Sequence, residues 1–175
     1  MIYGQVPPQA IELEESLLAA FLVDKSSLEH LDSVKAEYFY KTENGLIFEA
    51  ILALNASGQA VDLLTVTEKL RAMGELENVG GAYHITSLCN KVASAAHLEH
   101  HILIIKQKYI RRELITVNLR TMRNAYDDTF DELALLADHE KEIEKIGVST
   151  ITRDAEQIGN VLTSIFNSEV NMGLS

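Results

Sequence analysis

Apolar residues recur three and four positions apart along most of this chain, the spacing of one helix face. One helix is predicted over residues 9–23 and another over residues 43–56. Their expected buried stripes are Leu17, Leu18, Phe21 and Leu22 in the first, and Ile47, Ala50, Ile51 and Leu54 in the second. No stretch shows the strict alternation of a half-buried strand. The pattern predicts an all-α fold.

Capping signals divide the first half of the chain into short helices. Asp62 is a typical N-cap residue, and Gly74 is a typical stop signal, so a helix is expected between them. Shorter helices are expected over residues 26–33 and 83–90. Together with the first two helices they predict a small multi-helix head, residues 1–92.

The second half predicts a long helical hairpin. Residues 94–126 contain neither proline nor glycine, and a single long helix is expected there. Thr129 and Glu132 have the spacing of a capping box, which predicts a return helix over residues 129–146. The expected stripe of the return helix is Leu133, Leu136, Glu140, Ile143 and Ile146. We therefore expect an αα-hairpin over residues 93–147, within the same N-terminal domain as the head.

The last residues, 148–175, are interpreted as a linker with one amphipathic helix. A hinge-like break at residues 147–151 precedes it. Its apolar face is expected to consist of Ile158, Val161, Leu162, Ile165 and Phe166. A helix with no core of its own is suited to docking on a neighbour.

The charge of the chain is unevenly distributed. The formal net charge is −11, yet residues 91–126 carry seven bases and two acids between two strongly acidic flanks. An acidic chain is repelled by phosphate backbones, so direct strong binding of nucleic acid is not expected. The basic segment is interpreted mainly as a partner for the acidic neighbours that fold against it. The acids Glu12, Glu14 and Glu15 suit the N-terminal turns of the first helix.

Catalytic machinery is not recognisable in the sequence. There is no G-x-x-x-x-G-K-[S/T] motif, so no phosphate-cradling loop is expected, and Gly80-Gly81 is interpreted as a tight turn. Cys89 is the single cysteine, which excludes an intrachain disulfide and a cysteine-based metal cluster. His97 and His101 have metal-ligand spacing, but two histidines do not complete a site, and we predict no metal, cofactor or catalytic residue. An all-α enzyme that uses these histidines is one further hypothesis, and metal analysis of the purified protein would test it.

Several blocks of the sequence, in the same order, resemble the N-terminal domain of DnaB-type replicative DNA helicases. The first block is residues 6–18, where a proline precedes an acid-rich helix. The other four are Tyr38-Phe39-Tyr40 followed by Ile47–Leu54; residues 58–66; residues 80–83; and residues 94–96 followed by 109–115. One departure is that residues 42–45 lack the histidine that this family often has there. Each block alone is unspecific, but their common order over about 140 residues identifies the family.

This resemblance implies an oligomerisation and partner-binding domain in DNA replication. Members of the family pair and assemble into a ring collar as a trimer of dimers, and the collar recruits primase and, in some bacteria, the helicase loader. ATP and Mg²⁺ belong to a RecA-like motor domain that this chain lacks, so no ATP hydrolysis is expected from it. The resemblance also gives candidate partner-binding or intersubunit residues, which are Arg111, Arg112, Arg120 and Arg123. The alternative for each is a charge that is solvated or that lies between subunits without binding a partner protein.

An alternative interpretation keeps the fold but treats the chain as a stand-alone, helicase-like adaptor protein without a motor. Ending in mid-linker favours a fragment over such an adaptor. No secretory signal is recognised, and no apolar run approaches the ~20 residues that cross a membrane, so a cytoplasmic protein without a membrane partner is expected.

Overall fold

The structure is a computed structural model, and it describes residues 5–91 and 97–147. Within these residues every regular element is a helix, which confirms the predicted all-α class. None of the described helices is both long enough and apolar enough to cross a membrane.

The chain divides into two compact units, which are described separately here. One is Ile2–Arg112, and the other includes Glu113–Ser175. The boundary lies within one helix, α5 (Leu98–Ala125), whose first half belongs to the first unit. The domain boundaries expected from the sequence, at residues 92 and 147, remain a prediction.

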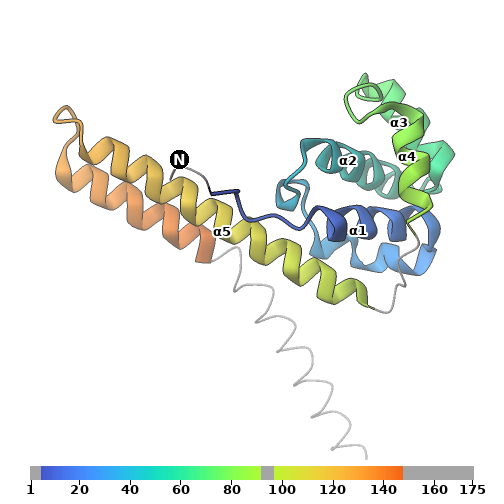
Figure 1. The fold of residues 1–175 in the computed structure, drawn as a ribbon, viewed down its shortest axis with the longest axis horizontal. Coiled ribbons are helices and arrows are strands. Elements are labelled where there is room, and N and C mark those ends of the chain that lie inside the picture. The colour runs from blue at the N-terminus through green and yellow to red at the C-terminus, as the bar shows by residue number, and fades with distance from the viewer. Residues whose placement is uncertain (1–4, 92–96, 148–175) are drawn as a thin grey trace, which may run out of the picture. The chain divides into compact units, whose positions relative to one another are not determined.

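The first unit packs short helices around one core. Its elements are α1 (Ile11–Val23), η1 (Lys25–Ser33), η2 (Ala36–Tyr38), α2 (Thr42–Ala56), α3 (Leu63–Met73), α4 (Gly81–Cys89) and the first half of α5 (Figure 1). α1 packs against α2 and α4, and α3 packs against the same two helices. Phe48 lies at the centre, with the Phe21 ring centroid 5.8 Å and the Phe39 ring centroid 5.3 Å away. All three rings are almost completely buried, so they exclude water from the middle of the head.

Local capping chemistry sets the bounds of α3 as predicted. The Asp62 carboxylate accepts the backbone N–H groups of Leu64 and Thr65, each at 2.9 Å. The Thr65 hydroxyl in turn accepts the Asp62 N–H at 3.0 Å, which completes a capping box. Gly74 ends the helix with a φ of 78°, a conformation that glycine adopts without steric cost. The segment expected as a short helix over residues 26–33 is instead the 3₁₀ helix η1.

Two neighbouring acids of α1 are buried rather than solvated. Glu14 is 1% exposed, and its carboxylate accepts the Tyr40 N–H at 2.7 Å and the Asn44 side-chain amide at 2.9 Å. Glu15 forms ion pairs with Lys41 and Lys91. Burial raises the pKa of the Glu15 carboxyl, but hydrogen bonds and charge from the two lysines outweigh it, and the net pKa lies below its usual value. These acids therefore attach α1 to the start of α2 and to the end of α4.

Arg112 joins three parts of the first unit. Its guanidinium donates to the Pro8 carbonyl at 2.9 Å and to the Tyr38 carbonyl at 2.7 Å. The same group lies 5.6 Å from the centre of the Tyr40 ring and 5.9 Å from that of Tyr109, within cation–π range. The arginine thus fastens the N-terminal segment and the end of η2 to α5.

Candidate functional site

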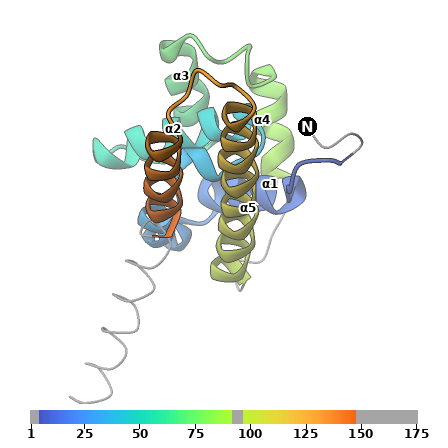
Figure 2. The same cartoon turned by 90° about the vertical axis from the view of Figure 1, so that its left-hand side faces the viewer.

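The second unit is an αα-hairpin, in which residues 132–147 form a helix that runs back along the end of α5 (Figure 2). The turn is held by the Asp127 carboxylate, which accepts the Thr129 N–H at 3.0 Å and the Thr129 hydroxyl at 2.7 Å. These bonds lower the pKa of Asp127 below its usual value. The second helix is capped by Asp131, whose carboxylate accepts the Ala134 N–H at 2.8 Å. The predicted capping box of Thr129 and Glu132 is wrong, because the Thr129 hydroxyl is bonded to Asp127.

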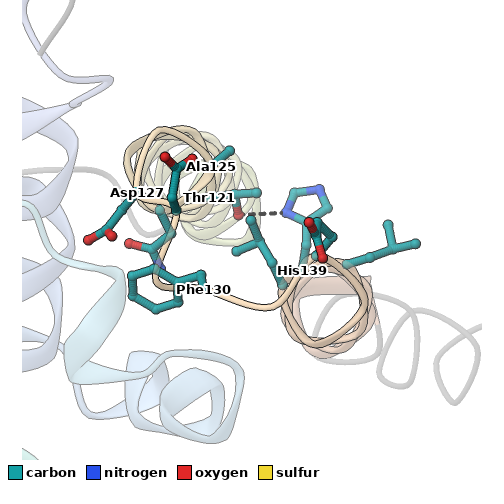
Figure 3. A pocket seen from close by; sticks show the side chains of 10 residues that line it. Thr121, Ala125, Asp127, Phe130 and His139 are labelled. Carbon is teal, nitrogen blue, oxygen red and sulfur yellow. Dashed lines mark hydrogen bonds between the residues drawn. The ribbon is translucent and has the colours of Figure 1, made fainter.

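The two arms of the hairpin meet through polar as well as apolar side chains. The Thr121 hydroxyl lies 3.0 Å from Nδ1 of His139 (Figure 3). Arg120 pairs with Glu142 at 3.2 Å, and Glu142 also pairs with Lys145 at 2.5 Å. Polar cross-links of this kind set the register of the arms but add little to the free energy of unfolding where they are exposed.

The predicted stripe of the second helix is partly wrong. Leu133 is 77% exposed and Leu136 is 55% exposed, whereas Leu135 is half-buried. Ile143 and Ile146 of the predicted stripe are half-buried, as expected. The main shielded row consists of Leu135, His139, Glu142 and Ile146, spaced four, three and four residues apart, with Ile143 beside it. Two of these four residues are polar. Helical spacing of apolar residues in the sequence therefore favours the neighbouring row that begins with Leu133 and Leu136, although these two leucines are exposed to water.

A row of apolar side chains, exposed except for the half-buried Leu119, lies on the second half of α5. We call Ile115, Leu119 and Met122, with Tyr126 just beyond the helix end, the α5 apolar stripe; they are spaced four, three and four residues apart. Ile115 is 46%, Met122 53% and Tyr126 87% exposed. Val117 and Thr121 point about half a turn away, given the ~100° between successive residues. The stripe is therefore available to a partner that the described part of the chain does not provide.

The four candidate arginines have different environments. Arg112 is half-buried and bonded inside the first unit, and Arg120 is paired across the hairpin. Arg111 and Arg123 are exposed, and no ion pair to either is found within residues 5–91 and 97–147. Their predicted role in partner or subunit contacts remains a prediction, as does that of the linker residues Ile158, Val161, Leu162, Ile165 and Phe166, which lie outside the described residues.

The histidines near the start of α5 do not gather other ligands around them. Among the described residues, no group of three or more histidine, cysteine or acidic side chains is arranged to hold a metal ion. Nδ1 of His101 is buried and has no hydrogen-bond partner in this part of the chain. Burial, followed by the neighbouring charges of His97 and His100, holds the pKa of His101 below its usual value. The arrangement favours a neutral, shielded imidazole.

Comparisons with known proteins identify this combination of head and hairpin. The sequence profile described as the DnaB-like helicase N terminal domain matches residues 6–107. The chain is 39% identical over 160 residues to the replicative DNA helicase DnaB of Rhodothermus marinus, covering 91% of this chain and 17% of that protein. It is 31% identical over 169 residues to the replicative DNA helicase DnaC of Bacillus subtilis, covering 96% of this chain and 37% of that protein. It thus spans well under half of these relatives.

Solved structures agree with the fold. The crystal structure of the N-terminal domain of DnaB helicase from Mycobacterium tuberculosis superposes with a TM-score of 0.75 at 26% identity, covering 81% of this chain and 99% of that one. A structure of a DnaB-like replicative helicase and its interactions with primase gives a TM-score of 0.62 at 19% identity, covering 83% of this chain and 34% of that one. The second likeness concerns the fold alone.

Proposed function

The chain belongs to the family of DnaB-like helicase N-terminal domains, and from this premise we propose that it is an assembly and partner-binding module of a hexameric replicative helicase. In this proposal the domain associates with copies of itself and binds primase, and the helicase loader where one is present. The family match over residues 6–107 and the homologous replicative helicases support it. The sequence lacks a P-loop motif, so ATP hydrolysis is assigned to a motor domain and not to this chain.

The observation that carries the proposal is the α5 apolar stripe. Its exposed members lie on one face of a long helix, with Arg123 beside them. Contiguous exposed apolar side chains with a polar border are typical of protein–protein interfaces. A helix face of this kind supplies anchors at helical spacing for a second helix. We assign self-association and primase binding to this face.

Sedimentation velocity over a wide concentration range tests self-association. The chain is expected to form dimers or larger assemblies at high micromolar concentration. The double variant Ile115→Glu, Met122→Glu is expected to sediment as a monomer, because each charge would be buried without a partner at the interface. The control is Leu64→Glu, which alters a 74% exposed leucine on α3, an element of the other unit. A wild-type chain that remains monomeric throughout would contradict the assembly proposal.

Titration with the primase of the same organism tests partner binding separately. Wild-type chain is expected to bind, and the stripe variant to bind on the order of tenfold more weakly, since central apolar anchors dominate binding energy. The Leu64→Glu control is expected to bind as the wild type does. Unchanged primase binding by the stripe variant would move the primase site to another surface while leaving assembly intact.

The linker proposal concerns residues 148–175. We propose that their apolar positions dock on a neighbouring subunit, because the spacing at Ile158, Val161 and Ile165 is that of one helix face. A stand-alone adaptor without a motor is the competing function. Reading about thirty codons of the parent gene beyond Ser175 discriminates the two: a P-loop soon downstream supports the helicase, and a stop codon supports the adaptor.

A further inference from the structure

A groove lies beside the turn of the hairpin, separate from the α5 apolar stripe. It has a volume of about 530 Å³ and lies between the end of α5 and the start of the second helix (Figure 3). We call it the turn groove. Its lining includes Asp127, Asp128, Phe130, Glu132, Leu135 and Leu136.

The apolar part of the turn groove is accessible. Phe130 is 47% exposed and Leu136 is 55% exposed, so two large side chains face water at its surface. A pocket for a small molecule usually encloses most of its ligand. Exposed walls of this kind instead suit one apolar side chain presented by a larger partner.

The charged part of the turn groove has a single sign. Asp127, Asp128 and Glu132 line it, together with His139, and among the described residues no lysine or arginine does. Asp127 is held in place by its two bonds from Thr129. All three are exposed residues that line one groove, so an approaching ammonium or guanidinium group is attracted without prior desolvation of a buried charge.

A second groove of about 350 Å³ on the same hairpin gives an internal comparison. It adjoins the turn groove and shares five lining residues with it, Thr121, Asn124, Phe130, Leu135 and His139, but its lining also includes Arg120 and Lys141. There Arg120 already pairs with Glu142 at 3.2 Å. The hairpin therefore balances the charge of one groove internally and leaves the other negative.

We propose that the turn groove binds a cationic amphipathic segment of a partner protein. An apolar side chain of that segment lies against Phe130 and Leu136, and flanking lysine or arginine side chains lie beside Asp128 and Glu132. The linker of this same chain is a poor occupant, because residues 148–175 carry three acids and one base. The proposal uses a different surface from the one assigned to primase and does not rest on that assignment.

The test is fluorescence anisotropy with the full chain and a designed probe. The probe is a fluorescein-labelled, alanine-based helical peptide with a leucine pair at i and i+4 flanked by lysines. Saturable binding is expected that weakens as salt is raised. Replacing the probe's leucines by alanine is expected to weaken binding as well, because the apolar contact is lost.

Matched variants separate the groove from general charge attraction. Asp128→Asn with Glu132→Gln removes two groove charges and is expected to weaken binding on the order of fivefold, since each exposed ion pair contributes modestly. The control Glu140→Gln with Glu144→Gln removes two exposed charges from the same helix outside the groove and is expected to change the affinity by less than a factor of about two. Circular dichroism checks that both double variants keep the helical content of the wild type.

Three results would overturn the proposal. Equal weakening by the two double variants would mean that the probe responds only to net charge. Loss of self-association by the groove variant without probe would mean that a second copy of the chain occupies the groove. Tighter probe binding after Leu162→Ala would mean that the chain's own linker competes for it.

Discussion

At the scale of single residues, Glu14 shows how a charged side chain is accommodated inside a small core. Its carboxylate accepts hydrogen bonds from Tyr40 and Asn44 while being almost completely removed from water. A buried charge is tolerated only where such donors replace its hydration. One donor is the backbone N–H of Tyr40, just before α2, and the other is the side-chain amide of Asn44 in the first turn of α2. Glu14 thus links α1 to the start of α2.

Replacing Glu14 by alanine is therefore expected to be costly. The Tyr40 N–H and the Asn44 amide would lose their acceptor in a buried site, and the free energy of unfolding should fall by about 2–3 kcal/mol. Urea unfolding followed by circular dichroism measures it. Glu12→Ala, in the same helix but exposed, should change it by less than about 0.5 kcal/mol. Equal effects of the two substitutions would show that the buried hydrogen bonds of Glu14 do not stabilise the fold.

His101 gives a pH dependence whose sign follows from its environment. Its pKa in the folded chain is below the ordinary 6.5, because burial and then the charges of His97 and His100 disfavour the imidazolium. The unfolded chain consequently binds more protons in this range. Stability from this group is complete above about pH 6.5 and is lost as the pH falls toward the folded pKa.

The variant His101→Gln is expected to lose less stability than the wild type between about pH 7 and pH 5. Thermal unfolding at several pH values provides the comparison, and the other histidines are the same in both proteins. Carboxyl groups such as Glu15, whose pKa is lowered, contribute their loss at more acidic pH. Parallel pH profiles for the two proteins would show that His101 does not titrate differently on unfolding.

Residue-level features were predictable from the sequence only where their partners are close in the chain. Asp62, Thr65 and Gly74 lie within or beside one helix, and their roles follow from local spacing. Glu14 and Glu15 were interpreted as charges favouring a helix N-terminus. Their actual partners are 26 or more residues away, and helical periodicity contains no information about such pairs.

At the scale of elements, the hairpin depends on where its second helix begins. Asp131 supplies the cap, whereas Thr129 belongs to the turn. Both residues are acceptable N-caps by type, and the sequence alone does not distinguish them. The choice is made by Asp127, which bonds the Thr129 hydroxyl and so makes the turn two residues longer than the capping box requires.

A pair of substitutions separates these two roles. Asp131→Ala is expected to lower the stability of the hairpin by about 1 kcal/mol, the usual cost of losing an N-cap. Thr129→Ala should cost less, because its backbone N–H still donates to Asp127. Amide hydrogen exchange over residues 132–140 reports the difference directly. Faster exchange in Thr129→Ala than in Asp131→Ala would restore the predicted capping box.

At the scale of the whole molecule, the negative net charge disfavours binding of nucleic acid. The net charge is −11, and several of the bases in the basic segment are occupied: Lys91 by Glu15, Arg112 by backbone carbonyls, Arg120 by Glu142. A phosphate backbone needs several free cations on one face. The basic segment was expected to pair with acidic neighbours; Lys91 and Arg120 do so, whereas the described partners of Arg112 are backbone carbonyls.

The chain is accordingly expected to bind single-stranded DNA only weakly at physiological salt. Anisotropy of a labelled oligonucleotide, measured with the same chain preparation as the peptide probe, tests it. Micromolar or tighter binding that weakens steeply with salt would show a cationic face that the described residues do not present.

The two bonds of Arg112 also order the folding of the chain in time. They join Arg112 to Pro8 and Tyr38, which precede it by 104 and 74 residues in the sequence. The ion pair of Lys91 with Glu15 joins residues that are 76 positions apart. Contacts of this separation close long loops and cannot form until both ends exist. During synthesis on the ribosome, the contact between Arg112 and the segment before the first helix therefore cannot form until more than a hundred residues have emerged. The hairpin, whose arms are neighbours in sequence, has no such delay.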